Sequence, residues 1–245
     1  MNIGISILNK KKFGNINIID PNTLPNRVFD IDADNATESG GIVTSAIDSS
    51  GNARHFAPNV FPNGPTVTTS LNGHQVFNFD GVDDVLVLPA QVLQAGTYTI
   101  YCVVKINDTA ITNYILDQDN SGSSTTRIAQ YLRASGTLAS IPFDTSGTPI
   151  FPGDVAITQG VWNHACLTVS PAGATLRVNG VAGTTAAIPT GNNIGIATQV
   201  AIGNRSNLFT TYAKMAVAHV LYYDALHTDE EIEGVSNFLK QKYSL

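Results

Sequence analysis

The stretch Phe77-Asn78-Phe79-Asp80-Gly81-Val82-Asp83-Asp84-Val85-Leu86-Val87-Leu88-Pro89 decides the fold class of this 245-residue chain. Phe77 and Phe79 alternate with polar residues, which is the pattern of a β-strand with one buried face. The run 85–88 is continuously apolar and predicts a second strand that is covered on both sides. A tight Asp-Gly corner joins the two runs. The stretch therefore predicts an all-β protein.

The composition fits many short strands joined by turns. Only 13% of the residues are charged, and the chain has 21 glycines. The net charge is −6 with only 13 Lys and Arg residues, so the chain lacks the basic surface that nucleic acids require, and no nucleic-acid partner is expected. Cys102 and Cys166 lie within apolar strand patterns, which favours buried free thiols over a disulfide.

The sequence predicts neither membrane insertion nor export by a signal peptide. No apolar run reaches the length of a membrane span, and Met1 is not followed by the charged and apolar segments of a secretory signal. We expect a soluble protein that is made in the cytoplasm, unless other machinery carries it out.

Further strands follow from the alternation of apolar and polar residues. Residues 96–106 form the clearest one, and 162–169 with 174–178 predict a hairpin. Asn179-Gly180 is the strongest hairpin signal, because a type I′ turn needs positive φ at both positions. About a dozen strands result, which is typical of a sandwich. The remaining ones are expected at residues 29–35, 41–43, 114–116, 127–133, 199–203 and 215–223.

One amphipathic helix is predicted at the C-terminal end of the sequence. Thr228 and Glu231 have the spacing of a capping box. Ile232, Val235 and Leu239 then recur at helical spacing and form one apolar stripe. We expect this helix to cover an edge or an end of the sandwich.

Several short segments, in this order, resemble the laminin-G-like members of the concanavalin A-like lectin/glucanase superfamily. The matching segments are residues 79–84, 98–100 with Lys105, 162–165, 177–180, 202–206 and 216–226. Residues 226–232 and 239–243 are similar to the closing helix of bacterial and phage members. The resemblance covers about residues 27–245. It implies an all-β, two-sheet antiparallel jelly-roll sandwich whose concave face carries ligands in many members. Val103 departs from the family, since relatives often have Trp there.

Residues 1–26 differ from the rest of the chain. Residues 2–7 and 15–19 alternate apolar with small polar side chains, and Pro21 and Pro25 follow. This pattern predicts a hairpin that packs on the main domain or pairs with another chain, because an isolated hairpin is marginally stable. We therefore divide the chain into an attachment segment, 1–26, and a laminin-G-like domain, 27–245.

The residues predict no catalytic site. Relatives that hydrolyse glucans use two carboxylates on one strand. The four glutamates here are Glu38, in a polar loop, and Glu230, Glu231 and Glu233, in the helix. The chain also lacks a Gly-x-Ser-x-Gly elbow, and its five histidines lack metal-ligand spacing. We expect a protein that is not an enzyme and requires no cofactor.

Calcium is the one ion that the sequence leaves open, because some relatives bind it. Asp117 and Asp119 alternate ahead of Gly122, but the closing glutamate of an EF-hand loop is absent. The adjacent Asp83 and Asp84 are a second candidate pair. Asp30, Asp32 and Asp34 also alternate. The alternative for each aspartate is a hydrogen bond to a turn amide.

Glycan binding needs aromatic faces and planar hydrogen-bonding groups on an exposed surface. The candidates that lie in strands, and that would point to the concave face, are Tyr101, Tyr131, Arg133, Trp162 and His164. Arg205 is the candidate in a loop. The alternative is core packing, above all for Trp162, and a purely structural role for His164.

These observations give one main hypothesis and two alternatives. We expect a non-enzymatic bacteriophage virion protein, a tail-fibre, receptor-binding or capsid-decoration component, released by lysis. Its expected partners are other virion proteins, through residues 1–26, and a cell-surface polysaccharide, and a homo-oligomer is predicted, with a trimer favoured. The alternatives are a carbohydrate-binding module of a bacterial surface or secreted protein, and a passive domain that binds only protein.

Overall fold

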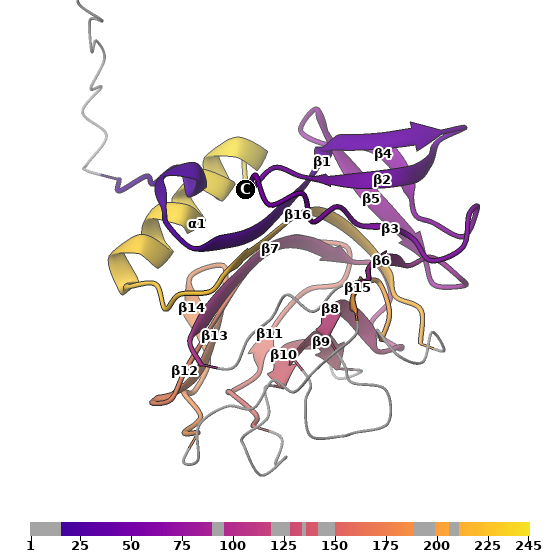
Figure 1. Cartoon of the computed structure of the whole chain (residues 1–245). Coiled ribbons are helices and arrows are strands. Elements are labelled where there is room, and N and C mark those ends of the chain that lie inside the picture. The colour runs from indigo at the N-terminus through magenta and orange to yellow at the C-terminus, as the bar shows by residue number, and fades with distance from the viewer. Residues whose placement is uncertain are drawn as a thin grey trace, which may run out of the picture.

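Two antiparallel sheets face each other, and α1 (Asp229–Tyr243) lies on the far side of the larger sheet (Figure 1). The computed structural model describes residues 16–89, 96–118, 128–133, 136–141, 150–188, 199–205 and 211–245, with backbone alone for 128–133 and 141. The predicted all-β, two-sheet sandwich with one C-terminal helix is confirmed. Within the described ranges, no helix is long and apolar enough to cross a membrane.

The larger sheet has nine strands. Their order is β1 (Arg27–Ser39), β2 (Ile42–Asp48), β4 (Thr66–Leu71), β5 (His74–Asp80), β16 (Lys214–Tyr223), β7 (Tyr98–Ile106), β12 (Trp162–Ser170), β13 (Gly173–Val178) and β14 (Val181–Ala182). One edge of β16 pairs with β7, and the other pairs first with β5 and then with β1. Strands β1, β2, β4 and β5 therefore close into a ring with β16.

The smaller sheet has seven strands. Their order is β11 (Val155–Ala156), β10 (Thr137–Ile141), β9 (Ile128–Arg133), β8 (Asn113–Gln118), β15 (Val200–Ile202), β6 (Leu86–Leu88) and β3 (Ala57–Pro58). Its inward side chains and those of the larger sheet form one core, in which Phe77 and Phe79 of β5 meet Leu86 and Leu88 of β6. Val87 points outward from β6 and is buried with Val85 and Ala201. The expectation of a strand covered on both sides is confirmed.

Each strand expected after residue 27 is present in the described residues, but the predicted N-terminal hairpin is not borne out at residues 16–19, which form no strand. The turn between β13 and β14 has φ of 52° at Asn179 and 83° at Gly180, as a type I′ turn requires. Both cysteines are free and buried. The sequence did not predict β3, β4, β10, β11 and β14, because four of them have only two to five residues, and β4 is largely exposed with little apolar alternation.

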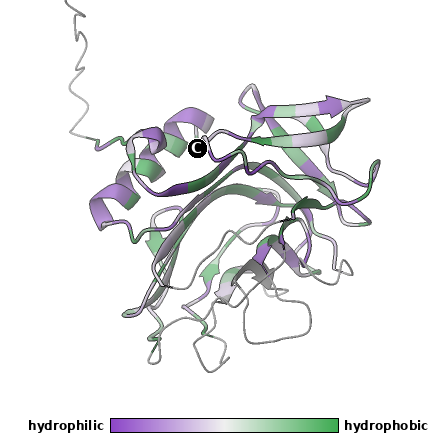
Figure 2. Ribbon diagram, viewed as in Figure 1, coloured by the Kyte–Doolittle hydropathy of each residue, from purple (hydrophilic) through white to green (hydrophobic). Residues whose placement is uncertain are grey.

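Helix α1 covers the outer face of the larger sheet. The capping box is present: the Thr228 hydroxyl accepts a bond from the Glu231 amide, and the Glu231 carboxylate accepts one from the Thr228 amide. Ile232, Val235 and Leu239 are buried against outward side chains of β7 and β16. In Figure 2 the ribbon of α1 carries both hydrophobic and hydrophilic residues, as an amphipathic helix does.

The chain from residue 16 to residue 26 is tied to α1 and to the larger sheet. It forms no strand at residues 16–20 and includes the short 3-10 helix η1 (Pro21–Thr23). The Ile19 amide donates to the Gly234 carbonyl at 3.1 Å, and the Tyr223 hydroxyl donates to the Pro21 carbonyl at 2.9 Å. A Cβ at position 234 would lie 2.4 Å from Ile19 Cγ1, so a glycine in mid-helix permits this contact. Residues 1–15 lie outside the described part.

A charged network joins β1 to the C-terminal end of α1. Asp30 accepts from His219 Nε2 at 2.7 Å, and Asp32 accepts from the Lys242 ammonium and from the Tyr243 hydroxyl. His219 Nδ1 and the Tyr243 hydroxyl share a bond of 3.0 Å. Burial alone would raise the pKa of Asp30, but the bond and charge of His219, with the charges of Arg27 and Lys242, hold it below its usual value. Asp30 and Asp32 are thus partners of cationic side chains.

We expect Asp30→Asn to lower the stability of the protein at neutral pH. We also expect the stability of this variant to fall less as the pH is lowered. A carboxyl group whose pKa is lower in the folded state stabilises the protein at pH values above its pKa in the unfolded state, which is about 4. This stabilisation is lost as the pH falls through the pKa of the folded state. Loss of one buried partner should lower the free energy of unfolding by ~3 kcal/mol at pH 7. Denaturant titrations from pH 7 to pH 2 measure both effects. The exposed Asp224→Asn is the control, and an Asp30→Asn protein as stable as the wild type at pH 7 contradicts the prediction.

Candidate functional site

A polar groove lies between α1 and the outer face of β12 and β13. It consists of two adjoining cavities, of about 350 Å³ and about 500 Å³. We call the first the acidic cavity, because Asp229 and Glu233 line it, and the second the aromatic cavity, because Trp162 lines it. His164 and Lys240 line both cavities, so the two lie next to each other, and we call them together the α1 groove.

The periodicities of strand and helix place these side chains. In β12 the odd and even positions face opposite sides, so Trp162, His164 and Cys166 share the outer face. On α1 the groove residues are spaced by three or four positions and lie on one side of the helix. They are Asp229, Glu233, Ser236, Asn237 and Lys240. The groove is therefore formed between residues that are distant in sequence.

His164 lines both cavities, and Asn179 lies beside it in the aromatic cavity. His164 is 4% exposed, and its backbone amide donates to Asn179 Oδ1 at 3.0 Å. Burial lowers the pKa of His164 to about 4, and the nearby charge of Lys240 acts in the same direction. The imidazole is therefore neutral at pH 7. Asn179 Nδ2 donates to Asn163 Oδ1 at 2.8 Å, which fixes the orientation of this amide.

Charged groups differ between the two cavities. In the acidic cavity, Arg177 and the exposed Asp229 form an ion pair at 2.9 Å, and Glu233 is exposed nearby. In the aromatic cavity, Trp162 is partly exposed, and Lys105 Nζ lies 5.3 Å from the centre of its ring. Among the described residues, no acidic side chain lines the aromatic cavity.

The predicted position on the concave face is wrong for Tyr101, Trp162 and His164. The inner face of the larger sheet is filled by the core against the smaller sheet, and these three residues alternate onto the outer face. Tyr101 is 1% exposed beneath α1, where its hydroxyl shares a bond of 2.8 Å with His227 Nδ1. Tyr101 cannot present its ring to a ligand in this arrangement, whereas Trp162 and His164 line the groove.

The remaining predicted contacts lie elsewhere. Tyr131 and Arg133 belong to β9, on the other sheet, and their side chains are outside the described part. Arg205 is half-buried after β15, and its amide donates to Asn204 Oδ1. It does not line the α1 groove. The prediction missed the helix side of the groove, whose signal was the recurrence of polar residues on one face of α1.

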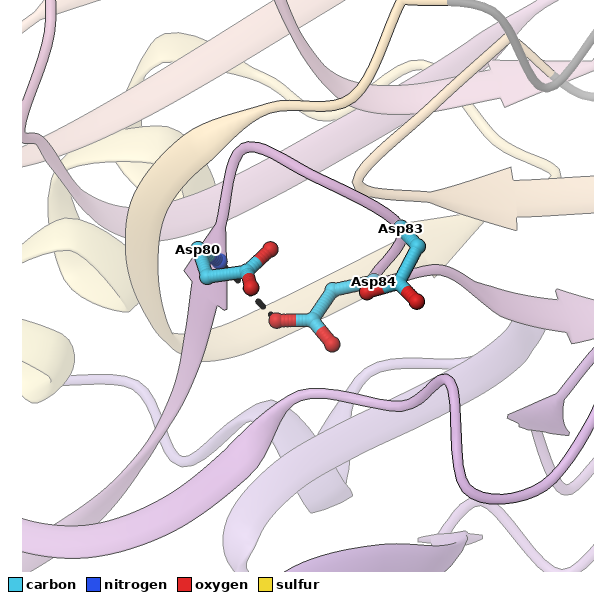
Figure 3. A group of neighbouring side chains, drawn as sticks. All are labelled: Asp80, Asp83 and Asp84. Carbon is cyan, nitrogen blue, oxygen red and sulfur yellow. Dashed lines mark hydrogen bonds between the residues drawn. The ribbon is translucent and has the colours of Figure 1, made fainter.

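The corner between β5 and β6 brings three carboxylates together (Figure 3). In Asp80, Asp83 and Asp84, one oxygen of each lies within 4.8 Å of the others. Asp84 Oδ2 accepts from the Asp80 amide at 2.9 Å, and Asp80 Oδ1 accepts from the Val82 amide at 2.7 Å. The expected bonds to turn amides are thus present. Burial, with the charges of Asp80 and Asp83, raises the pKa of Asp84 to about 6.

Three hard oxygen donors suit calcium, so the donor set fits the ion that the sequence left open. The three carboxylates border a cavity of about 290 Å³. Asp117, fully buried in β8, is not part of this group, and Asp119 lies outside the described residues. The structure therefore brings together Asp83 and Asp84 with an additional residue, Asp80.

The fold and the groove permit comparison with known proteins. A family model described as the concanavalin A-like lectin/glucanases superfamily matches residues 80–233, more than half of the chain. The chain belongs to this superfamily. Its predicted membership is confirmed, and the domain is lectin-like. A search of curated proteins gave no match.

Solved structures with the same fold include binding domains of bacterial toxins. The binding domain of Paraclostridial Mosquitocidal Protein 1 is 16% identical, with a TM-score of 0.64 over 86% of this chain and 52% of that one. The binding domain of botulinum neurotoxin DC, in complex with rat synaptotagmin II, is 12% identical, with a TM-score of 0.62 over 87% and 52%. This chain thus spans about half the length of these structures, and the likeness shows a shared fold.

We expect Asp84→Asn to raise stability at neutral pH. Because the folded pKa of Asp84 is raised to about 6, the folded protein loses stability as the pH rises from about 4 to 6. The amide carries no charge, so in chelator at pH 7.5 the variant should gain about 1–2 kcal/mol in free energy of unfolding, a value reduced for solvent screening. Thermal melts at pH 4.5 and 7.5 measure the difference.

The control is Asp83→Asn, which keeps the Asp84 carboxyl and should keep most of the pH effect. If the cluster holds calcium, added calcium raises the melting temperature of the wild type at pH 7.5 and leaves Asp84→Asn unchanged. Equal pH dependence of wild type and Asp84→Asn would show that the Asp84 carboxyl is not the titrating group.

Proposed function

We propose that this protein is a non-enzymatic recognition domain that binds a glycan in the α1 groove. One observation carries the proposal: a partly exposed indole and several fixed planar polar groups line a single elongated groove. Indole rings pack on the apolar faces of sugars, while amides, carboxylates and guanidinium groups bond their hydroxyls. The aromatic cavity supplies Trp162 and Asn179, and the acidic cavity supplies Arg177, Asp229 and Asn237.

The groove is also preorganised, which limits the entropy cost of binding. Its floor is a sheet, and its wall is a helix tied to that sheet by the network of Asp30, Asp32 and Lys242. Asn237 Nδ2 donates to the Asn17 carbonyl at 2.8 Å, which holds the amide at the groove margin. The membership in a lectin-like superfamily and the likeness to toxin binding domains support recognition as the role.

The placement of the glutamates supports a role without catalysis. Glu231 bonds the Thr228 amide in the capping box, and Glu38 accepts from the Gly41 amide in the β1–β2 turn. Glu230 and Glu233 are exposed on α1. A retaining or inverting glycosidase needs two carboxyl groups across one scissile bond, and no strand in the described residues carries such a pair of glutamates.

We also propose the setting in which the domain works. The first proposed setting is the virion of a bacteriophage, in which the protein assembles through its N-terminal segment. The second is a bacterial surface or secreted protein. The likeness to receptor-binding domains of bacterial toxins favours the second setting for the same recognition role. Calcium at Asp80, Asp83 and Asp84 would be an accessory ion outside the α1 groove.

We expect Trp162→Ala to weaken glycan binding. The test is saturable binding of the labelled protein to a polysaccharide panel and to bacterial cells, with and without chelator. Loss of one aromatic platform should weaken affinity by ~10-fold or more, given ~1.5 kcal/mol for such a contact. Phe61→Ala removes an aromatic side chain that is 56% exposed outside the groove and should bind as the wild type does. Absence of binding in the wild type on every surface overturns the proposal.

We expect deletion of residues 1–15 to leave a folded protein that no longer assembles. The contacts of Ile19 and Pro21 with α1 and β16 are retained in this variant, so the thermal melting temperature should change little. Light scattering should show a trimer for the full chain and a monomer for the truncated one. A monomeric full chain contradicts the predicted homo-oligomer, and an unchanged oligomer after truncation contradicts the role of this segment.

A further inference from the structure

The charges of the α1 groove are separated along its length. Both acidic side chains, Asp229 and Glu233, line the acidic cavity, toward the beginning of α1. In the aromatic cavity, toward the end of α1, Lys240 is the one charged side chain among the described lining residues. Lys105 adds a second ammonium 5.3 Å from the Trp162 ring. A ligand that spans the groove therefore meets carboxylates at one end and ammonium groups at the other.

The two lysines at the aromatic end are available for a ligand. Within the part of the chain that the structure describes, neither Lys105 nor Lys240 has a carboxylate within ion-pair distance. Lys242, two residues further along, is by contrast paired with Asp32. Both lysines are half-buried, and Lys240 lines the aromatic cavity.

The other side chains that the structure describes along the aromatic cavity are uncharged, and the backbone carboxyl group of Leu245 is the one negative group among these lining residues. His164 is neutral at pH 7 and offers hydrogen bonds alone. Asn72 and Asn179 are uncharged, and Leu71 and Val161 are apolar. An ammonium group beside an aromatic ring and two amides suits a sugar ring that carries an anionic substituent.

We propose that the glycan bound in the α1 groove is acidic and that its anionic group binds Lys240 beside Trp162. The inference rests on the proposed function and specifies its ligand. The acidic group, a carboxylate or a sulfate, lies in the aromatic cavity, and Lys105 adds to the attraction. Neutral sugar units extend toward the acidic cavity, where Asp229 and Glu233 accept bonds from their hydroxyls.

The experiment compares matched acidic and neutral probes on the full chain. The pairs are trigalacturonic acid with its carboxyl-reduced form, sialyllactose with lactose, and a sulfated lactose as the arm that separates sulfate from carboxylate. Affinities are measured by calorimetry for wild type, Lys240→Gln, Lys240→Arg and Lys105→Gln. Lys214→Gln is the matched control, because it removes one exposed positive charge outside the groove. Melting temperatures confirm that each variant is folded.

We expect an acidic probe to bind at least ~10-fold more tightly than its neutral partner, because charge-assisted bonds are the stronger ones. Lys240→Gln should remove this preference, Lys240→Arg should restore most of it, and Lys105→Gln should reduce it. The preference should stay constant from pH 6 to pH 8, because His164 remains neutral over that range.

Other outcomes overturn the inference in distinguishable ways. Equal affinity for acidic and neutral probes, with loss in Trp162→Ala, overturns the acidic ligand and leaves glycan binding in place. An equal loss in Lys240→Gln and Lys214→Gln shows nonspecific attraction to the protein's charge and overturns the site. Absence of binding for every probe overturns the inference, and absence on the wider polysaccharide panel overturns the proposed function as well.

Discussion

Strand β16 is buried on both of its faces, and the rest of the structure depends on covering them. Of its ten residues, only Lys214 is exposed. Met215, Val217 and Tyr222 face the core shared with the smaller sheet, while Leu221 and Tyr223 face α1. Neither cover suffices alone, because an open apolar face of this size costs free energy in water. The sandwich and the terminal helix are therefore one cooperative unit.

The attachment of α1 uses polar contacts that an apolar stripe alone does not supply. The stripe defines which side of the helix is buried, but it allows the helix to shift along the sheet. The bonds of His219 with Tyr243 and of Asp32 with Lys242 fix its C-terminal end, and the Gly234 contact with Ile19 fixes its middle. This fixed position defines the width of the α1 groove, so the charged network supports the proposed site without touching a ligand.

The α1 groove and the corner between β5 and β6, with Asp80, Asp83 and Asp84, are two kinds of polar site. In the groove, planar groups and one indole line a continuous surface with separated charges, as a chain-like ligand requires. At the corner, three carboxylates crowd within 4.8 Å, and burial together with the charges of Asp80 and Asp83 raises the pKa of Asp84. The groove suits an extended organic ligand, and the corner suits a small cation.

Local periodicity by itself determined the strands around Phe77–Pro89, the type I′ turn at Asn179-Gly180 and the capped helix, because each depends on neighbours a few residues apart. The period of two in a strand places Tyr101 and Trp162 on one face of their strands. Only the pairing of the two sheets showed that this face lies away from the inner core. Which face of a strand meets water is decided by contacts between distant segments, such as Tyr101 with His227 and Asp30 with His219. Only the tertiary structure therefore moved the candidate site from the concave face to the groove beside α1.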